Sequence, residues 1–114
     1  IMQMDIKCRG FELTDGLREH VRKRLACNLH HGNTAIRQVS VRLSDINGPR
    51  GGADKRCQIA LRLKGLPRIV VEDTEADLYL AIDRAADRVG RTLLRRLDRA
   101  LRAAPGIPAP EASA

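Results

Sequence analysis

The sequence is poor in aromatic residues, which make up 2% of its 114 residues. Phe11 and Tyr79 are the only two, and tryptophan is absent, so Leu, Ile, Val and Ala must build the core. No segment approaches the roughly 20 consecutive apolar residues that span a bilayer. The alternating polar and apolar residues at the start are unlike a secretory signal peptide. We therefore expect a cytoplasmic protein with no membrane partner.

Cysteine is also scarce, and its pattern predicts no framework of disulfides. The odd number and irregular spacing favour reduced thiols at all three positions, Cys8, Cys27 and Cys57. Cys27 forms a CxxHH cluster with His30 and His31, but structural zinc sites need four ligands in paired spacing and no second pair follows. Residues 48–52 are rich in glycine but lack the Lys-Ser/Thr of a nucleotide-binding loop. We predict no metal, no cofactor, no small-molecule substrate and no enzymatic activity.

Negative charge is in the minority. The chain has 21 Lys and Arg against 14 Asp and Glu, which gives a formal net charge of +7 and a pI of about 10.2. Such an excess favours polyanionic partners, of which nucleic acid is the commonest and an anionic membrane surface the second.

Strict alternation of apolar and polar residues predicts four strands. The first covers 2–9 and ends at Gly10. The second turns Val39, Val41 and Leu43 inward. The third covers 55–64 and turns Cys57, Ile59, Leu61 and Leu63 inward. The fourth is a short strand at 68–72 after a turn at 65–67.

Apolar residues at helical spacing predict two helices. The stripe of the first is Leu17, Val21, Leu25 and Leu29, and the stripe of the second is Leu78, Ile82, Ala86, Val89, Leu93, Leu97 and Ala100. The first is capped by Thr14, has about 15 residues and ends in the stretch 28–34. The second is capped by Thr74 and runs to about Ala103. The order is therefore strand, helix, three strands, helix. Because the strands alternate, we predict an α+β fold, βαβββα, in which both helices cover one face of a four-stranded, mainly antiparallel sheet.

The chain is expected to form one domain. We assign 2–104 to a single domain, which its positive charge marks as a candidate RNA-binding domain, and 105–114 to a disordered tail rich in Pro and Ala. The tail carries no positive charge that could contact RNA.

The last helix carries a row of arginines opposite its apolar side. At about 100° per residue, six of them share one face over roughly 27 Å: Arg84, Arg88, Arg91, Arg95, Arg99 and Arg102. A solvated helix exterior also accounts for such a row, because basic residues late in a helix favour its macrodipole. Two details favour RNA instead. The face uses arginine alone, with Asp87 and Asp98 only along one edge, and the planar guanidinium suits phosphate oxygens and stacks on bases.

Further cations lie elsewhere in the pattern. The first helix adds Arg22, Lys23 and Arg24, spread around its circumference, and we predict that they contribute to RNA binding. The strand exteriors supply Arg62, Lys64 and Arg68, on the open face of the sheet or at its edge.

Two segments resemble the hibernation-promoting factor and ribosome-associated inhibitor family, also called sigma-54 modulation proteins. Residues 12–25, ELTDGLREHVRKRL, are similar to the opening of that family's first helix. Residues 77–83, DLYLAID, followed by DRVGRTL at 87–93, resemble the motif that begins its last helix. The resemblance spans about residues 2 to 102 and implies a fold akin to double-stranded RNA-binding domains. The resemblance implies the short form of the family, for which we expect no C-terminal dimerisation domain.

The resemblance implies a ribosome-associated translation inhibitor. Such a protein binds small-subunit ribosomal RNA at the decoding region, competes with messenger and transfer RNA, and silences ribosomes in stress or stationary phase. Arg88, Arg91 and Arg95 fall where the family presents basic residues to RNA, and 22–24 align with its basic first helix. The alternative is a regulatory module that binds another protein, or a general binder of double-stranded RNA.

Other motif positions carry different expectations. Asp77 and Tyr79 match the family motif, and we expect structural roles for both: the carboxylate at the start of the helix and the tyrosine buried in the core. Thr92 and Leu94 depart from the polar residues usual in the family beside Arg91.

Overall fold

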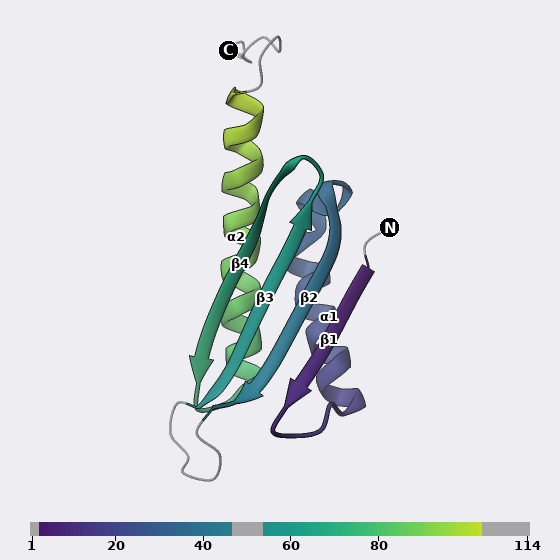
Figure 1. The fold of residues 1–114 in the computed structure, drawn as a ribbon, viewed down its shortest axis with the longest axis vertical. Helices are drawn as coiled ribbons and strands as arrows, with labels where there is room; N and C mark the ends of the chain where they lie inside the picture. Colours follow the sequence, from purple (N-terminus) through teal and green to yellow (C-terminus); the bar gives the residue numbers. More distant parts are fainter. Residues whose placement is uncertain (1–2, 47–53, 104–114) are drawn as a thin grey trace.

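The protein is a single sheet covered by two long helices in the computed structural model, which describes residues 3–46 and 54–103 (Figure 1). The elements follow the predicted order, with a short 3₁₀ helix, η1, after the first helix. Their bounds are β1 Gln3–Arg9, α1 Asp15–Leu29, η1 His30–Ala35, β2 Ile36–Asp45, β3 Lys55–Leu63, β4 Leu66–Glu75 and α2 Leu78–Ala103. The 47–52 loop and the 105–114 tail lie outside the described residues.

The four strands form one mixed sheet in the order β1-β2-β3-β4. β1 pairs parallel to β2, because α1 returns the chain to the same end of the sheet before β2 begins. β2, β3 and β4 are successive antiparallel neighbours. Gly65, with a φ of +68°, allows the tight turn between β3 and β4. The predicted α+β class and mainly antiparallel pairing are confirmed.

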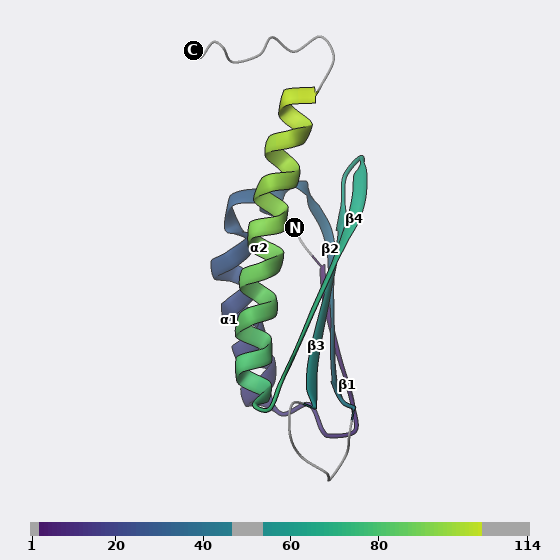
Figure 2. The ribbon, with the colours of Figure 1, turned by 90° about the vertical axis from the view of Figure 1, so that its left-hand side faces the viewer.

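Both helices pack on the same face of the sheet, and the other face is open (Figure 2). The inward side chains predicted for the second and third strands are buried against them. The predicted helix stripes are buried too: Leu17, Val21, Leu25 and Leu29 on α1, and Ile82, Ala86, Val89 and Leu93 on α2. Leu78, Leu97 and Ala100 are only half-buried. The predicted stripe of α2 omits Ala81 and Ala85, which are fully buried.

The boundary between β4 and α2 differs from the prediction. Thr74 does not cap the helix: it lies within β4, opposite Arg56. The cap is Asp77, whose Oδ1 accepts a hydrogen bond from the backbone N–H of Tyr79 at 3.2 Å. β4 also begins earlier than expected and includes Pro67. A proline is tolerated there because β4 is an edge strand, whose outer backbone groups have no partner strand.

Candidate nucleic-acid interface

The six arginines of the predicted row are all exposed on α2. The helix turns this face outward because its opposite side is buried by residues such as Ile82, Val89 and Leu93. Helical geometry gives the row a length of roughly 27 Å from Arg84 to Arg102. The structure therefore brings these six predicted residues onto one surface, which we call the arginine row.

The N-terminal part of the arginine row leans toward the edge strand β4. Arg84 Nε lies 3.5 Å from a carboxylate oxygen of Glu75. Arg88 donates to the backbone carbonyl of Glu72 at 2.9 Å. Arg96, outside the row, donates to the carbonyl of Pro67 at 3.1 Å. These contacts fix α2 against the open edge of the sheet and pre-order two guanidinium groups.

The rest of the arginine row is weakly engaged. Arg102 pairs with Asp98 at 3.2 Å, as its spacing predicts, and Arg95 lies 3.5 Å from the Thr92 hydroxyl. Arg91 and Arg99 have no hydrogen bond or ion pair within residues 3–46 and 54–103. Exposed ion pairs are worth about 0–1 kcal/mol. A polyanion can therefore recruit these groups at little cost.

The three predicted residues of α1 do not join the arginine row. Arg24 faces α2, with its Nε 3.2 Å from Asp83 and one terminal nitrogen 3.5 Å from Asp87. Asp87, four residues before Arg91 on α2, thus contacts α1 instead. Arg22 and Lys23 are exposed, about 200° and 100° around α1 from Arg24. The nine predicted residues thus fall into the arginine row, one helix-to-helix contact and a separate exposed pair.

A polar cluster that the sequence did not predict joins α1 to α2. His20 Nε2 lies 2.7 Å from Asp83 Oδ1, the same oxygen that Arg24 approaches. The His20 ring also packs edge-on against Tyr79, with their centroids 4.7 Å apart. Tyr79 is 42% exposed, so the expectation that it fills the core is wrong. Its position at the start of α2 places the ring over α1 rather than over the sheet.

The cysteines and histidines form no metal centre in the part of the chain that the structure describes. His30 Nδ1 donates to the Cys27 carbonyl at 3.1 Å. The ring centroids of His30 and His31 lie 3.8 Å apart. Cys27 is exposed, whereas Cys57 is buried beneath the helices. Burial raises the pKa of the Cys57 thiol to about 12, with a smaller contribution from nearby Asp73. A thiol held protonated in this way is a poor nucleophile.

Comparison with known proteins places the fold in a family. Residues 4–100 match the family described as "Sigma 54 modulation protein / S30EA ribosomal protein". The chain belongs to this family. Its members are ribosome-associated proteins, and membership confirms that the chain is a binding protein rather than an enzyme. The resemblance seen at residues 12–25 and 77–93 is confirmed as well.

Relatives in three organisms share the sequence or the fold. The chloroplastic ribosome-binding factor PSRP1 of Spinacia oleracea is 27% identical over 100 residues, which are 86% of this chain and 33% of that protein. The chain thus spans about a third of the length of this curated relative.

Two solved structures share the architecture. The N-terminal domain of Thermus thermophilus Protein Y is 32% identical, with a TM-score of 0.70 over 83% of this chain and 98% of that one. A ribosomal subunit interface protein from Coxiella burnetii is 16% identical, with a TM-score of 0.71 over 86% of this chain and 99% of that one, and shares the fold. None of the described helices combines the length and apolarity needed to cross a membrane.

Proposed function

We propose that this protein is a translation inhibitor that binds small-subunit ribosomal RNA at the decoding region and silences ribosomes in stress or stationary phase. The arginine row is the observation that carries the proposal. Six exposed guanidinium groups along roughly 27 Å of a rigid helix can contact several phosphates of a folded RNA without reordering the protein. The ribosome-associated family of the chain supports the same partner.

The inhibition needs no chemistry. A folded domain that occupies the decoding region excludes messenger and transfer RNA by volume and by competition for the same phosphates. The small ribosomal subunit and its RNA are the proposed partners, and the cytoplasm is the proposed location because ribosomes work there. The names of the spinach and Coxiella relatives, a ribosome-binding factor and a subunit interface protein, support this assignment.

Sedimentation of bacterial ribosomal subunits through sucrose gradients tests the proposal. We expect the protein to sediment with small subunits, and a saturating messenger RNA with bound initiator transfer RNA to displace at least nine-tenths of it. Sedimentation with large subunits alone would contradict the proposal. Undiminished binding in the presence of messenger and transfer RNA would also contradict it, as would equal affinity for any RNA duplex.

A further inference from the structure

The open face of the sheet carries a second concentration of positive charge, on the side opposite the helices. The strand registers place Lys7 beside Arg42 and Gln58 in one row across the sheet. The neighbouring row holds Arg9, Ser44 and Arg56. Four cations thus stand on three adjacent strands within two rows about 7 Å apart.

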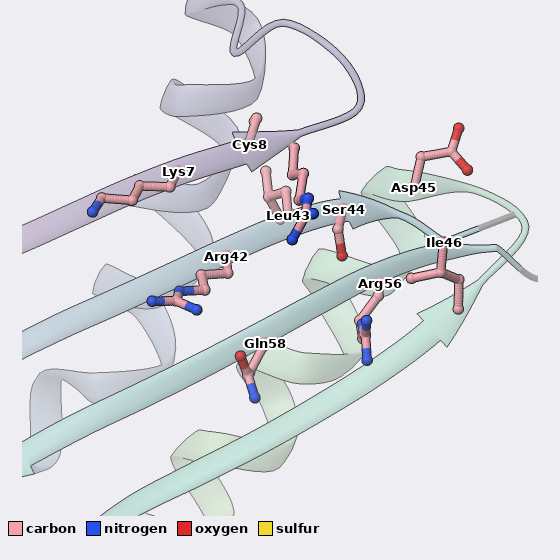
Figure 3. Close-up of a pocket in the computed structure, with 10 residues that line it drawn as sticks. Lys7, Cys8, Arg42, Leu43, Ser44, Asp45, Ile46, Arg56 and Gln58 are labelled. Atoms are coloured by element: carbon pink, nitrogen blue, oxygen red, sulfur yellow. The ribbon is translucent and has the colours of Figure 1, made fainter. Parts of the chain in front are cut away.

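Small side chains hollow this face between the cations. Ser40 and Ala60 are register partners at the centre of the sheet. A hollow of about 730 Å³ is lined by Lys7, Arg9, Arg42 and Arg56, and a second of about 320 Å³ by Ser40, Ala60 and Arg68. Arg42 and Gln58 line both hollows, so the two lie side by side, and we call them together the sheet groove. Figure 3 shows Lys7, Arg42 and Arg56 projecting from neighbouring strands on the side away from the helices.

The protein itself makes little use of these charges. Lys7 lies 4.0 Å from Asp5, and Arg56 lies 3.6 Å from Glu72, in exposed pairs. Arg9 and Arg42 have no ion pair within the described residues. Lys7 and Arg42 are direct cross-strand neighbours, and like charges in that relation destabilise a sheet. The cations of this face therefore do not stabilise the fold, and their arrangement fits an anionic partner outside the chain.

The chemistry of the sheet groove fits the backbone of RNA. Its walls offer lysine and arginine donors suited to phosphate oxygens, and Ser44 and Gln58 add neutral donors. Neither aromatic residue of the chain lines it, so bases have no aromatic platform to stack on. Cations outnumber carboxylates on the open face of the described strands, where Lys7, Arg9, Arg42, Arg56, Arg62 and Arg68 stand beside Asp5 and Glu72.

We propose that the sheet groove is a second phosphate-binding surface, which holds another segment of the same small-subunit ribosomal RNA. This inference rests on the proposed function. The arginine row and the sheet groove lie on opposite layers of the domain, so RNA would contact the protein on two sides. A domain clamped between two RNA segments dissociates only when both contacts break, which favours a long residence time on the ribosome.

A triple substitution of Lys7, Arg9 and Arg42 to Gln tests the sheet groove. Gln keeps a polar side chain, although a shorter one than Lys or Arg, and it removes the mutual repulsion of the three positive charges, so the melting temperature should stay equal or rise. Affinity for isolated small subunits at about 0.1 M salt should fall at least tenfold. The slope of log K against log salt should shrink by roughly two to three units, because each lost phosphate contact contributes about 0.7 to 0.9. The control replaces Arg18, an exposed cation of α1 outside both surfaces, with Gln and should change neither quantity appreciably.

Cross-linking tests separately whether the sheet groove contacts RNA or protein. A photoreactive phenylalanine analogue at Ala60, on the floor of the sheet groove, should cross-link to ribosomal RNA in the complex. Cross-links to ribosomal proteins alone would overturn the inference. An unchanged affinity and salt slope in the Gln variant would overturn it as well.

Failure of the inference is distinguishable from failure of the proposed function. If substitution of the arginine row weakens binding and the Gln variant binds like the parent, the function stands and the sheet groove is not an RNA site. If only the Gln variant loses affinity, the sheet groove stands and the row is not the contact. If the parent does not bind small subunits at all, the proposed function falls and the inference falls with it.

Discussion

Cys57 is a thiol buried between the sheet and the helices, and its environment makes stability depend on alkaline pH. Burial raises its pKa to about 12 from an ordinary value of 9.0. The folded protein therefore keeps the thiol proton over a range in which the unfolded chain releases it. This contribution to stability is fully present below about pH 9 and is lost as the pH rises toward 12.

We predict that replacement of Cys57 by alanine flattens this pH dependence. The parent should lose free energy of unfolding between pH 9 and 11 at up to about 1.4 kcal/mol per pH unit through this thiol. The variant should start about 1 kcal/mol less stable at pH 7, because a buried side chain has been shortened. Urea unfolding followed by circular dichroism at each pH measures both. Equal alkaline losses in the two proteins would show that the buried thiol is not responsible.

At the scale of elements, the packing of α2 on α1 depends on Gly90. Glycine in a helix interior costs roughly 1 kcal/mol relative to alanine. Gly90 nevertheless occupies the middle of α2, at a buried position. A Cβ at this position would lie 2.7 Å from the carbonyl oxygen of Asn28, on the last turn of α1. Because that obstacle is backbone, α1 would have to move away. Gly90 thus lets the two helices approach closely enough for Arg24 and His20 to reach α2.

We predict that Gly90→Ala lowers the free energy of unfolding by about 1–3 kcal/mol, despite the gain in helix propensity. Gly16→Ala is the matched control, in the first turn of α1. A Cβ there would lie 3.6 Å from the Tyr79 hydroxyl, which is ordinary contact, so this variant should be equal or up to about 1 kcal/mol more stable. Urea unfolding compares the two. A Gly90→Ala protein as stable as Gly16→Ala would rule out the proposed close approach.

The elements themselves could largely be predicted from periodicity, and the exceptions have local causes. Thr74 is a good capping residue, but its pairing with Arg56 of the neighbouring strand β3 keeps the chain extended, and Asp77 caps the helix instead. Pro67 marks a turn in most contexts, and only its place on an edge strand lets β4 begin before it. Both errors arise because local preference was overruled by strand pairing, which a single sequence does not reveal.

At the scale of the whole molecule, the sequence predicts the arginine row but not the rest of the interface. Helical spacing alone places six arginines on one face of α2. The separation of Arg24 from the row depends on how α1 packs against Asp83 and Asp87. The sheet groove depends on the register that sets Lys7 beside Arg42, thirty-five positions away in the chain. Arrangements that join distant segments appear only once the fold is known.

The most direct test of the account is the salt dependence of small-subunit binding after Arg88, Arg91 and Arg95 are changed together to Glu. The three side chains are exposed, so circular dichroism should show an intact fold. The expected loss of stability is a few tenths of a kcal/mol each for Arg91 and Arg95, and about 1 kcal/mol for Arg88, which also loses its hydrogen bond to the Glu72 carbonyl. Arg18→Glu reverses a charge on α1 outside the row and serves as the control.

The account predicts that the row variant no longer binds small subunits at about 0.1 M salt, while the control loses far less. Milder Ala changes at the same three positions should reduce the salt slope by roughly one unit per arginine. A folded Glu variant that sediments with small subunits like the parent would show that the arginine row is only a solvated helix face.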